Sequence, residues 1–284
     1  TVIDRSNAKD VELLALYGMG TIEEISVSPS GSYVAAATIS GVSLYQTGSP
    51  EYAQHYLTNQ SVRAIDFSPN GEMVAAGLQT GELVVISIGN GQVILREAIS
   101  DAAILSVAYS PDGNYIAVGD LEGMVAIYSA ADLTLSAETS GHSGRINDLA
   151  WSPDSQTLAS GSSDFYTRLW NLDGQEIDFY LFQNGSITSL AFSNDGTRLA
   201  TGSSDFTVFI RNLEDEEALP IVLENDNIVR TIAFSPDDKQ IAIGGDDYGV
   251  DTWILFADDG TYLGFLSQTL NHDYTVISTE YLPD

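Results

Sequence analysis

One phrase recurs six times along this chain, and its spacing constrains the fold more than any other feature of the sequence. The phrase is a run of alternating apolar residues that ends in an apolar, usually aromatic, side chain and continues as Ser-Pro-Asp-Gly or a near copy. Its copies span residues 22–31, 62–71, 104–113, 146–155, 187–196 and 229–238. The last apolar residues of the runs are Val27, Phe67, Tyr109, Trp151, Phe192 and Phe234, at spacings of 40, 42, 42, 41 and 42. Such self-similarity indicates a repeat architecture in which neighbouring units bury each other's apolar faces.

Each repeat reads as four short β-strands. In the second repeat, residues 62–67 predict a first strand, and Pro69 followed by Asn-Gly suits a tight turn. In the fourth repeat, residues 157–160, 167–170 and 177–182 predict the second, third and fourth strands. A small residue recurs in the second strand, where closely packed sheets need one: Ala35, Ala75, Ala117, Ala159, Ala200 and Ala242. Four strands in a repeat of about 40–45 residues are typical of one blade of a β-propeller.

The two ends of the chain determine the predicted number of blades. Residues 22–270 hold six full repeats, residues 274–284 read as the start of another, and residues 1–18 read as the end of one. Joining both ends in one blade would protect strand edges that are otherwise exposed. We therefore expect a single all-β domain over residues 1–284, a seven-bladed β-propeller of four-stranded antiparallel blades whose last blade is shared by both termini. That shared blade lacks its second strand and most of its third, so six blades are the alternative.

The sequence resembles the WD-repeat family from residue 1 to about residue 270, most closely in the fourth repeat. That repeat contains Gly141-His142, the run Leu-Ala-Ser-Gly-Ser-Ser-Asp at 158–164, and Leu-Trp-Asn at 169–171. In this family a His, a Ser, an Asp and a Trp form a hydrogen-bonded chain inside the blade. The resemblance assigns this structural tetrad to His142, Ser160, Asp164 and Trp170. Buried imidazole, carboxylate and indole groups each need a partner, which gives the tetrad a structural role.

The other repeats keep only part of this set. The fifth has Thr201 and Asp205 but Arg211 at the Trp position, whereas the sixth has Asp247 and Trp253. These departures are those of a divergent member of the family, similar to bacterial or archaeal ones, and we expect most blades to be stabilised by apolar packing.

The charge of the chain argues against two classes of partner. Forty Asp and Glu residues against ten Lys and Arg residues give a formal net charge of −30. A surface this negative repels the phosphates of nucleic acids and of anionic lipids, and no apolar run is long enough to span a bilayer. We therefore expect no nucleic-acid partner and no membrane insertion. A protein partner with a basic segment is compatible with the charge, as are divalent cations.

Composition also bears on redox chemistry and on location. The chain has no cysteine, which excludes disulfides, thiolate catalysis and cysteine-ligated zinc. Its acidity, its two lysines, Lys9 and Lys239, and its start at Thr1 favour an exported protein over a cytoplasmic one.

The sequence shows no arrangement of residues typical of catalysis. The motifs of nucleotide-binding loops, zinc proteases and serine hydrolases are absent. Asp246, Asp247 and Asp251 could supply oxygen ligands to Ca²⁺, but their spacing differs from that of an EF-hand loop. We therefore predict no enzymatic activity, no catalytic residue and no cofactor, with at most weak binding of a divalent cation.

A partner-binding face is predicted at the loops that precede the first strand and at the turns between the second and third strands. In the WD-repeat family the corresponding face commonly binds peptides or domains, and the resemblance implies the same here. The residues assigned to this face are Met19, Ile39, Leu121, Arg145, Asp226, Ile228 and Asp246. Clustered exposed apolar groups mark interaction sites, and Arg is enriched at their centres. The leading hypothesis is a non-catalytic protein-interaction scaffold or subunit of a larger assembly; the alternative is an exported propeller enzyme or binder that acts on carbohydrate or depends on a divalent cation.

Overall fold

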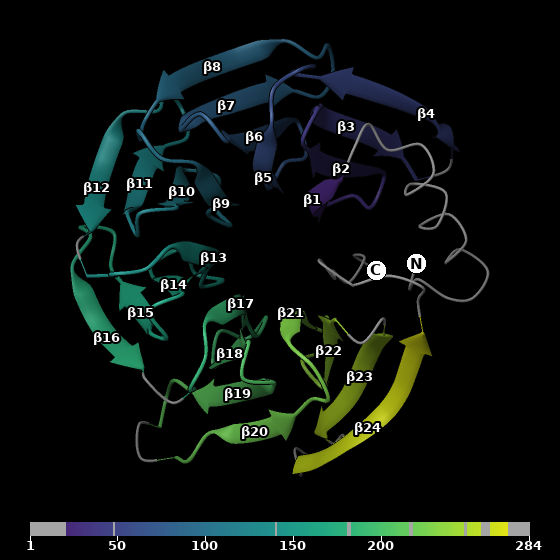
Figure 1. Ribbon diagram of the computed structural model, residues 1–284, viewed down its shortest axis with the longest axis vertical. Coiled ribbons are helices and arrows are strands. Elements are labelled where there is room, and N and C mark those ends of the chain that lie inside the picture. Colours follow the sequence, from purple (N-terminus) through teal and green to yellow (C-terminus); the bar gives the residue numbers. More distant parts are fainter. Residues whose placement is uncertain are drawn as a thin grey trace. The chain divides into compact units, whose positions relative to one another are not determined.

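The computed structural model describes residues 21–47, 49–139, 141–180, 183–215, 218–246, 249–256 and 262–271. The regular elements of these residues are strands β1 to β24, which form six four-stranded antiparallel sheets (Figure 1). The chain divides into two compact units, residues 1–140 with 282–284 and residues 141–281, and each unit contains three of the sheets. We call each sheet a blade. The described residues include no helix with the length and hydrophobicity that a membrane span requires.

The first unit contains blades one to three. Blade one consists of β1 (Ile22–Val27), β2 (Tyr33–Thr38), β3 (Gly41–Gln46) and β4 (Ser49–Tyr56). Blade two consists of β5 (Val62–Phe67), β6 (Met73–Leu78), β7 (Glu82–Ser87) and β8 (Val93–Ala98). Blade three consists of β9 (Ile104–Tyr109), β10 (Tyr115–Asp120), β11 (Val125–Ser129) and β12 (Leu135–Thr139).

The second unit contains blades four to six. Blade four consists of β13 (Ile146–Trp151), β14 (Leu158–Ser162), β15 (Thr167–Trp170) and β16 (Glu176–Tyr180). Blade five consists of β17 (Ile187–Phe192), β18 (Arg198–Ser203), β19 (Thr207–Asn212) and β20 (Ile221–Glu224). Blade six consists of β21 (Val229–Phe234), β22 (Gln240–Gly245), β23 (Gly249–Phe256) and β24 (Tyr262–Asn271).

The prediction of seven blades is wrong. Each of the six sheets takes its four strands from one continuous segment, and β24 completes the sixth, so no sheet of the described residues is shared between the two ends of the chain. The segments that were to form the shared blade, residues 1–18 and 274–284, lie outside the described residues. Each described blade instead closes within its own repeat, because its four consecutive strands pair with one another in order.

The serine of the recurring Ser-Pro-Asp-Gly phrase organises the first turn of every blade. In blade four, Ser152 Oγ donates to Asp154 Oδ1 at 2.6 Å and accepts from the N–H of Thr157 at 2.9 Å. In all six blades, the backbone N–H of the residue five positions after this serine donates to the serine Oγ, at 2.9–3.0 Å. The glycine of the phrase has a positive φ, as at Gly71 (70°) and Gly113 (74°), which a residue without a Cβ adopts at no steric cost. The phrase is therefore a hairpin signal, as predicted.

Neighbouring blades pack closely enough to exclude even a methyl group at some positions of the second strand. A Cβ added to Gly161 would lie 2.6 Å from Ile187 Cγ2 in the next blade, and one added to Gly202 would lie 2.5 Å from Val229 Cγ1. The buried residues accordingly form clusters between successive blades, of blades one and two, two and three, four and five, and five and six. Glycine is required at positions 161 and 202 because the sheets pack face to face at short range.

The first strand of each blade has one edge without a strand partner, and in the second unit the preceding blade supplies side chains to that edge. Asp148 of β13 accepts a hydrogen bond from the N–H of Leu190 in β17 at 2.6 Å. Asn147 donates to the carbonyl of Ile187 at 2.6 Å. One blade further on, Ser189 accepts from the N–H of Ile232 at 3.1 Å, and Thr188 donates to the carbonyl of Val229 at 2.6 Å. Backbone groups that would otherwise be left unpaired between the blades are thereby satisfied.

The first unit repeats this arrangement with other side chains. Glu24 and Ser26 of β1 accept from the N–H groups of Ile65 (2.8 Å) and Phe67 (3.2 Å) in β5. Asp66 of β5 then accepts from the N–H of Tyr109 in β9 at 2.7 Å and from Ser26 Oγ at 3.1 Å. The first strand of one blade is therefore linked to the first strand of the next blade by hydroxyl or carboxylate side chains at alternate positions.

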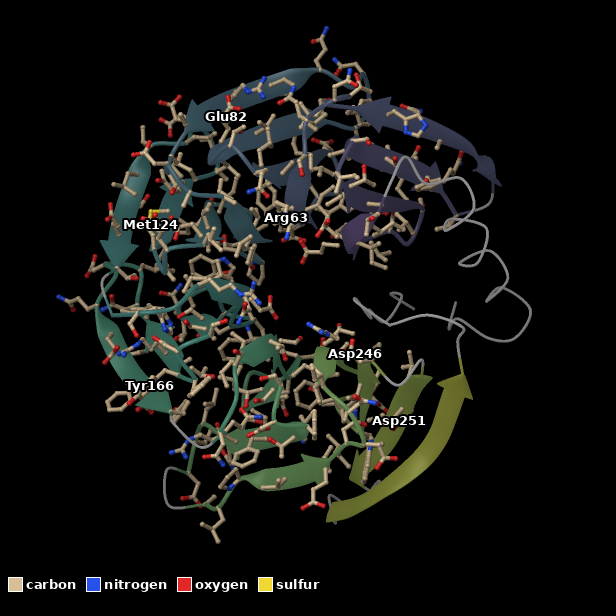
Figure 2. All side chains as sticks on the ribbon, viewed as in Figure 1. Arg63, Glu82, Met124, Tyr166, Asp246 and Asp251 are labelled. Atoms are coloured by element: carbon tan, nitrogen blue, oxygen red, sulfur yellow. The ribbon has the colours of Figure 1, made fainter. Side chains whose placement is uncertain are left out.

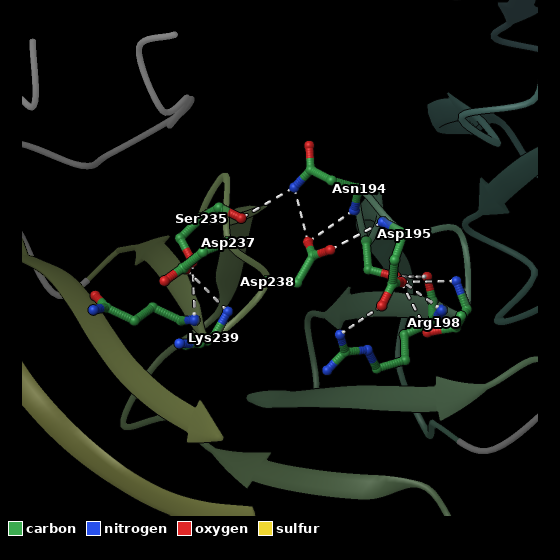
Figure 3. Close-up of polar contacts among 10 residues, drawn as sticks. Asn194, Asp195, Arg198, Ser235, Asp237, Asp238 and Lys239 are labelled. Atoms are coloured by element: carbon green, nitrogen blue, oxygen red, sulfur yellow. Dashed lines mark hydrogen bonds and ion pairs between the residues drawn. The ribbon is translucent and has the colours of Figure 1, made fainter. Parts of the chain in front are cut away.

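At the opposite end of the first strands, Asp238 joins blades five and six (Figure 3). Its carboxylate accepts from the N–H of Asn194 at 2.8 Å and from the N–H of Asp195 at 2.9 Å. The Asn194 amide also donates to the carbonyl of Ser235 at 3.0 Å. Asp238 stands where four other repeats have glycine and adopts the same left-handed φ, 57°. The left-handed conformation costs free energy for a residue other than glycine, and Asp238 adopts it where its side chain connects two turns.

Burial of the linking carboxylates changes their acidity. Partial enclosure between blades raises the pKa of Asp66 to about 6 and the pKa of Asp148 to about 7, against the opposing effect of the N–H groups that donate to them. A folded-state pKa above the unfolded value means that folding favours the protonated form. Each group therefore stabilises the fold most at acidic pH, and this contribution is lost as pH rises through the folded pKa.

We predict that Asp148→Asn removes the part of this pH dependence that Asp148 contributes, because asparagine resembles the protonated carboxyl and does not titrate. Between pH 5 and pH 7 the unfolding free energy of the wild type should fall relative to that of Asp148→Asn, by up to about 1.4 kcal/mol per pH unit. Water that reaches part of the side chain reduces this slope. Urea unfolding of both proteins across this range measures it, with the exposed Asp173→Asn as control. A constant difference between wild type and Asp148→Asn would contradict the prediction.

Candidate functional site

The candidate site is the end of the blades at which the first strand begins and the second strand ends. In blade four, Ile146 at the start of β13 pairs with Ser162 at the end of β14. The loop before β13 and the turn from β14 to β15 therefore lie at the same end of the sheet, and the equivalent pairing recurs in the other blades. We call this the loop end. The residues of the predicted face that the structure describes belong to loops or turns of this kind.

The four tetrad residues of blade four are hydrogen-bonded in one chain. Trp170 Nε1 donates to Ser160 Oγ at 2.7 Å, and Ser160 Oγ lies 2.7 Å from His142 Nε2. His142 Nδ1 lies 3.0 Å from Asp164 Oδ2. The Asp164 carboxylate also accepts from the N–H groups of Ser143 (2.9 Å) and Tyr166 (3.1 Å). The tetrad thus connects the third strand of the blade to the loop before its first strand.

Burial and hydrogen bonding determine the protonation states of His142 and Asp164 in this hydrogen-bonded set. The His142 side chain has no exposed surface and that of Asp164 is 6% exposed. Burial lowers the pKa of His142 and outweighs the opposing influence of Asp164. Burial acts to raise the pKa of Asp164, but hydrogen bonds from the Ser143 N–H and from His142 outweigh it and lower that pKa. A neutral His142 that donates from Nδ1 to Asp164 and accepts at Nε2 from Ser160 satisfies all four groups.

Blade five replaces the tetrad with an amide network, which the sequence analysis did not identify. Gln183 occupies the place of His142 and accepts from Thr201 Oγ1 at 2.7 Å. Its amide also donates to the carbonyl oxygens of Thr201 and Thr207, both at 3.0 Å. Asp205 accepts from the N–H of Asn184 at 2.6 Å. The repeat spacing places Gln183 at the His position, so register was the signal that could have found it.

In blade five the Trp position holds Arg211, whose guanidinium carbon lies 4.4 Å from the ring centroid of Tyr180. In blade six Trp253 is present, but Ile243 takes the place of Ser160. The buried Trp253 Nε1 has no hydrogen-bond partner among the described residues. Asp247 lies outside the described residues. Apolar packing therefore replaces the polar chain here, as expected for most blades.

Of the residues predicted for the partner-binding face, Met19 lies outside the described residues. Ile39 and Leu121, in the first unit, occupy equivalent positions in the turns after β2 and β10 and are 49% and 47% exposed. In the second unit, Arg145 and Asp226 are exposed, and Ile228 and Asp246 are partly buried. The described residues hold no group of three or more His, Asp or Glu side chains placed to bind a metal ion.

Two charged residues of this set, Arg145 and Asp246, form contacts within their own unit. Asp246, labelled in Figure 2, binds the guanidinium of Arg230 through both carboxylate oxygens. The Nε–Oδ1 and Nη2–Oδ2 distances are both 3.0 Å. Arg145 Nε donates to Ser163 Oγ at 3.2 Å. Both guanidinium groups remain partly accessible at the loop end, but Asp246 is largely neutralised by its pair.

We predict that Asp164→Ala destabilises the protein by about 1–3 kcal/mol, because it leaves His142 and the Ser143 N–H without an acceptor. The measurement is urea unfolding at pH 7. Asp173→Ala, at an exposed aspartate of the same blade, should change stability by less than about 0.5 kcal/mol. Equal unfolding free energies of Asp164→Ala and Asp173→Ala would show that the tetrad contributes nothing to stability.

Comparison with known proteins identifies the repeat. The family described as WD domain, G-beta repeat matches residues 49–85, 94–129, 133–171, 178–212 and 221–254, which together exceed half of the chain. No curated protein sequence matches the chain significantly. Among solved structures, a chain from a crystal structure of the mitotic checkpoint complex is similar in fold, with a TM-score of 0.81 and 18% sequence identity over 90% of this chain and 79% of that one. The matched repeats and the six four-stranded blades show that this chain belongs to the family of WD40 repeat proteins.

Proposed function

We propose that this protein is a non-catalytic scaffold, or a subunit of a larger assembly, that binds a protein partner through its loop end. The observation that carries the proposal is the exposure of Ile39 and Leu121 at equivalent turns of blades one and three. Turns at the surface need no large apolar side chain for their own stability, and an exposed apolar side chain at an equivalent turn of two blades is suited to a contact with a partner. The WD40 fold is typical of protein-interaction scaffolds, and the structural relative belongs to a multiprotein complex.

Charge supports a partner with a basic segment. The net charge of −30 produces a negative potential that attracts Lys- and Arg-rich surfaces and repels acidic ones. Association with such a partner is accelerated by this potential and weakened by salt, because exposed charges are screened within about 10 Å at 0.1 M ionic strength.

The carboxylates with raised pKa support binding rather than catalysis. A general acid needs a carboxyl group free to reach a substrate. The oxygens of Asp66 and Asp148, whose pKa is raised, already accept hydrogen bonds from the first strand of the next blade. Their geometry suits them to holding blades together.

We predict that Ile39→Asp combined with Leu121→Asp, both in exposed turns of the first unit, weakens partner binding by at least about tenfold without unfolding the protein, because each change puts a charge into an apolar contact. The measurement is affinity capture with quantitative mass spectrometry, followed by titration of the captured partner. The control is Leu135→Asp on β12, where the leucine is 53% exposed but lies away from the loop end. Equal capture by the double variant and the control would place the interface elsewhere, and a wild type without a specific partner would contradict the scaffold proposal.

A further inference from the structure

Two phenylalanines of the second unit occupy a backbone conformation that strongly disfavours them. Phe165, in the turn between β14 and β15, has a φ of 76°, and Phe206, in the equivalent turn of blade five, has a φ of 74°. A bulky residue at positive φ is a steric outlier that persists only where the surroundings enforce it. Both side chains also remain accessible to solvent, Phe165 to 43% and Phe206 to 45%.

The fold itself does not require an aromatic side chain in this turn. Blades two and three have Gly81 (φ 80°) and Gly123 (φ 95°) at the same position. At Gly81 an added Cβ would overlap the carbonyl oxygen of Ser100, so that turn has no room for a side chain. Blades four and five therefore open this position to a phenyl group where other blades use the residue that the turn prefers.

Both turns are held rigidly from within. Asp164 accepts from the N–H of Tyr166, and the N–H of Phe165 donates to the Ser162 carbonyl at 3.2 Å. Asp205 accepts from the N–H of Thr207 at 3.1 Å. The Phe206 carbonyl accepts from the N–H of Asn225 at 2.8 Å.

The loops beside these turns approach them closely. A Cβ on Gly144 would lie 2.8 Å from the Asp164 nitrogen, and one on Gly185 would lie 2.7 Å from the Asp205 nitrogen. The two phenyl groups are therefore presented on fixed backbones, and a partner that binds them loses little additional backbone entropy.

The surroundings of Phe206 carry negative charge. Glu224, at the end of β20, pairs across the sheet with Thr207, the residue after Phe206. Glu224 and Asp226 are both exposed, and they flank Asn225, whose N–H binds the Phe206 carbonyl. An aromatic group next to exposed carboxylates matches a segment in which apolar side chains alternate with Lys or Arg.

We propose that Phe165 and Phe206 are anchors for a basic, apolar segment of a partner protein, bound at the loop end of blades four and five. This inference rests on the scaffold function proposed above and specifies where and by what chemistry the partner is held. Neighbouring blades place the two phenyl groups at corresponding positions of adjacent sheets. The segment inserts apolar side chains against the two rings and directs its cationic groups toward Glu224 and Asp226.

The test variant is Phe165→Gly combined with Phe206→Gly, because glycine is the residue that blades two and three use in this turn. Glycine relieves the positive φ, so the melting temperature should be unchanged or higher while binding is lost. A residue that only packs would give the opposite result, since its removal lowers the melting temperature. The matched control is Leu219→Gly, at a leucine that is 91% exposed in the connection between β19 and β20 of the same unit.

The probe is a displayed library of random peptides of about twelve residues, selected on the wild-type protein. We expect selected peptides to combine Lys or Arg with Leu, Ile or aromatic residues. Measured by fluorescence anisotropy, they should bind the control like the wild type and the double glycine variant at least about tenfold more weakly. Raising the salt concentration should weaken binding to the wild type.

Four results would overturn the inference. The first is a lower melting temperature of the double glycine variant, which would make the phenyl groups packing residues. The second is undiminished peptide binding by that variant; if Ile39→Asp with Leu121→Asp abolishes the same binding, the scaffold function stands and only the anchor assignment fails. The third is sedimentation velocity that shows wild-type self-association abolished by the glycine changes, which would make a second copy of the chain the occupant. A wild type that selects no peptide also contradicts the inference, and protein capture then tests the scaffold function separately.

Discussion

The free edge of the first strand in each blade is the constraint on which the rest of this structure depends. A β-strand with one unpaired edge leaves N–H and C=O groups without partners between tightly packed sheets, where water is largely excluded. Side chains of the preceding blade satisfy these groups. Asp148 accepts a hydrogen bond from the N–H of Leu190, and Thr188 donates one to the carbonyl of Val229. These bonds set the register of one blade against the next, and the close approach at Gly161 and Gly202 follows from it.

This arrangement explains why the polar chain inside blade four is not needed everywhere. His142 and Asp164 tie a loop to the third strand, but blade five achieves the same connection with Gln183, and blade six has Ile243 at the serine position. Apolar packing and the links between first strands are common to the blades, whereas the tetrad is a local addition. All six repeats therefore adopt the same four-stranded sheet, although blades five and six depart from the hydrogen-bonded set of blade four.

Because stability resides in the strands and in their edges, the loop end can carry side chains that the fold does not need. Ile39 and Leu121 are large and exposed in turns that a polar residue would serve equally well, and Phe165 is held in a strained conformation. A protein that retains such residues gives up stability at positions where an external contact can use them. The negative potential of the chain also favours basic partners over acidic ones at these apolar contacts.

Much of the fold followed from local pattern, because a strand, a Ser-Pro-Asp-Gly turn and the repeat spacing are encoded within a few residues. The sequence alone determined the four-stranded repeat, with the third strand of blade four predicted at 167–170 as observed. The four tetrad residues came from the family resemblance and not from the local pattern. The sequence led to the wrong number of blades, because a local pattern predicts a strand but not the segment with which that strand pairs. Only the tertiary structure decided which carboxylates bridge the blades and which turns carry strained aromatics, since a hydrogen-bond partner some 40 residues away and the sign of a φ angle both depend on how the sheets pack.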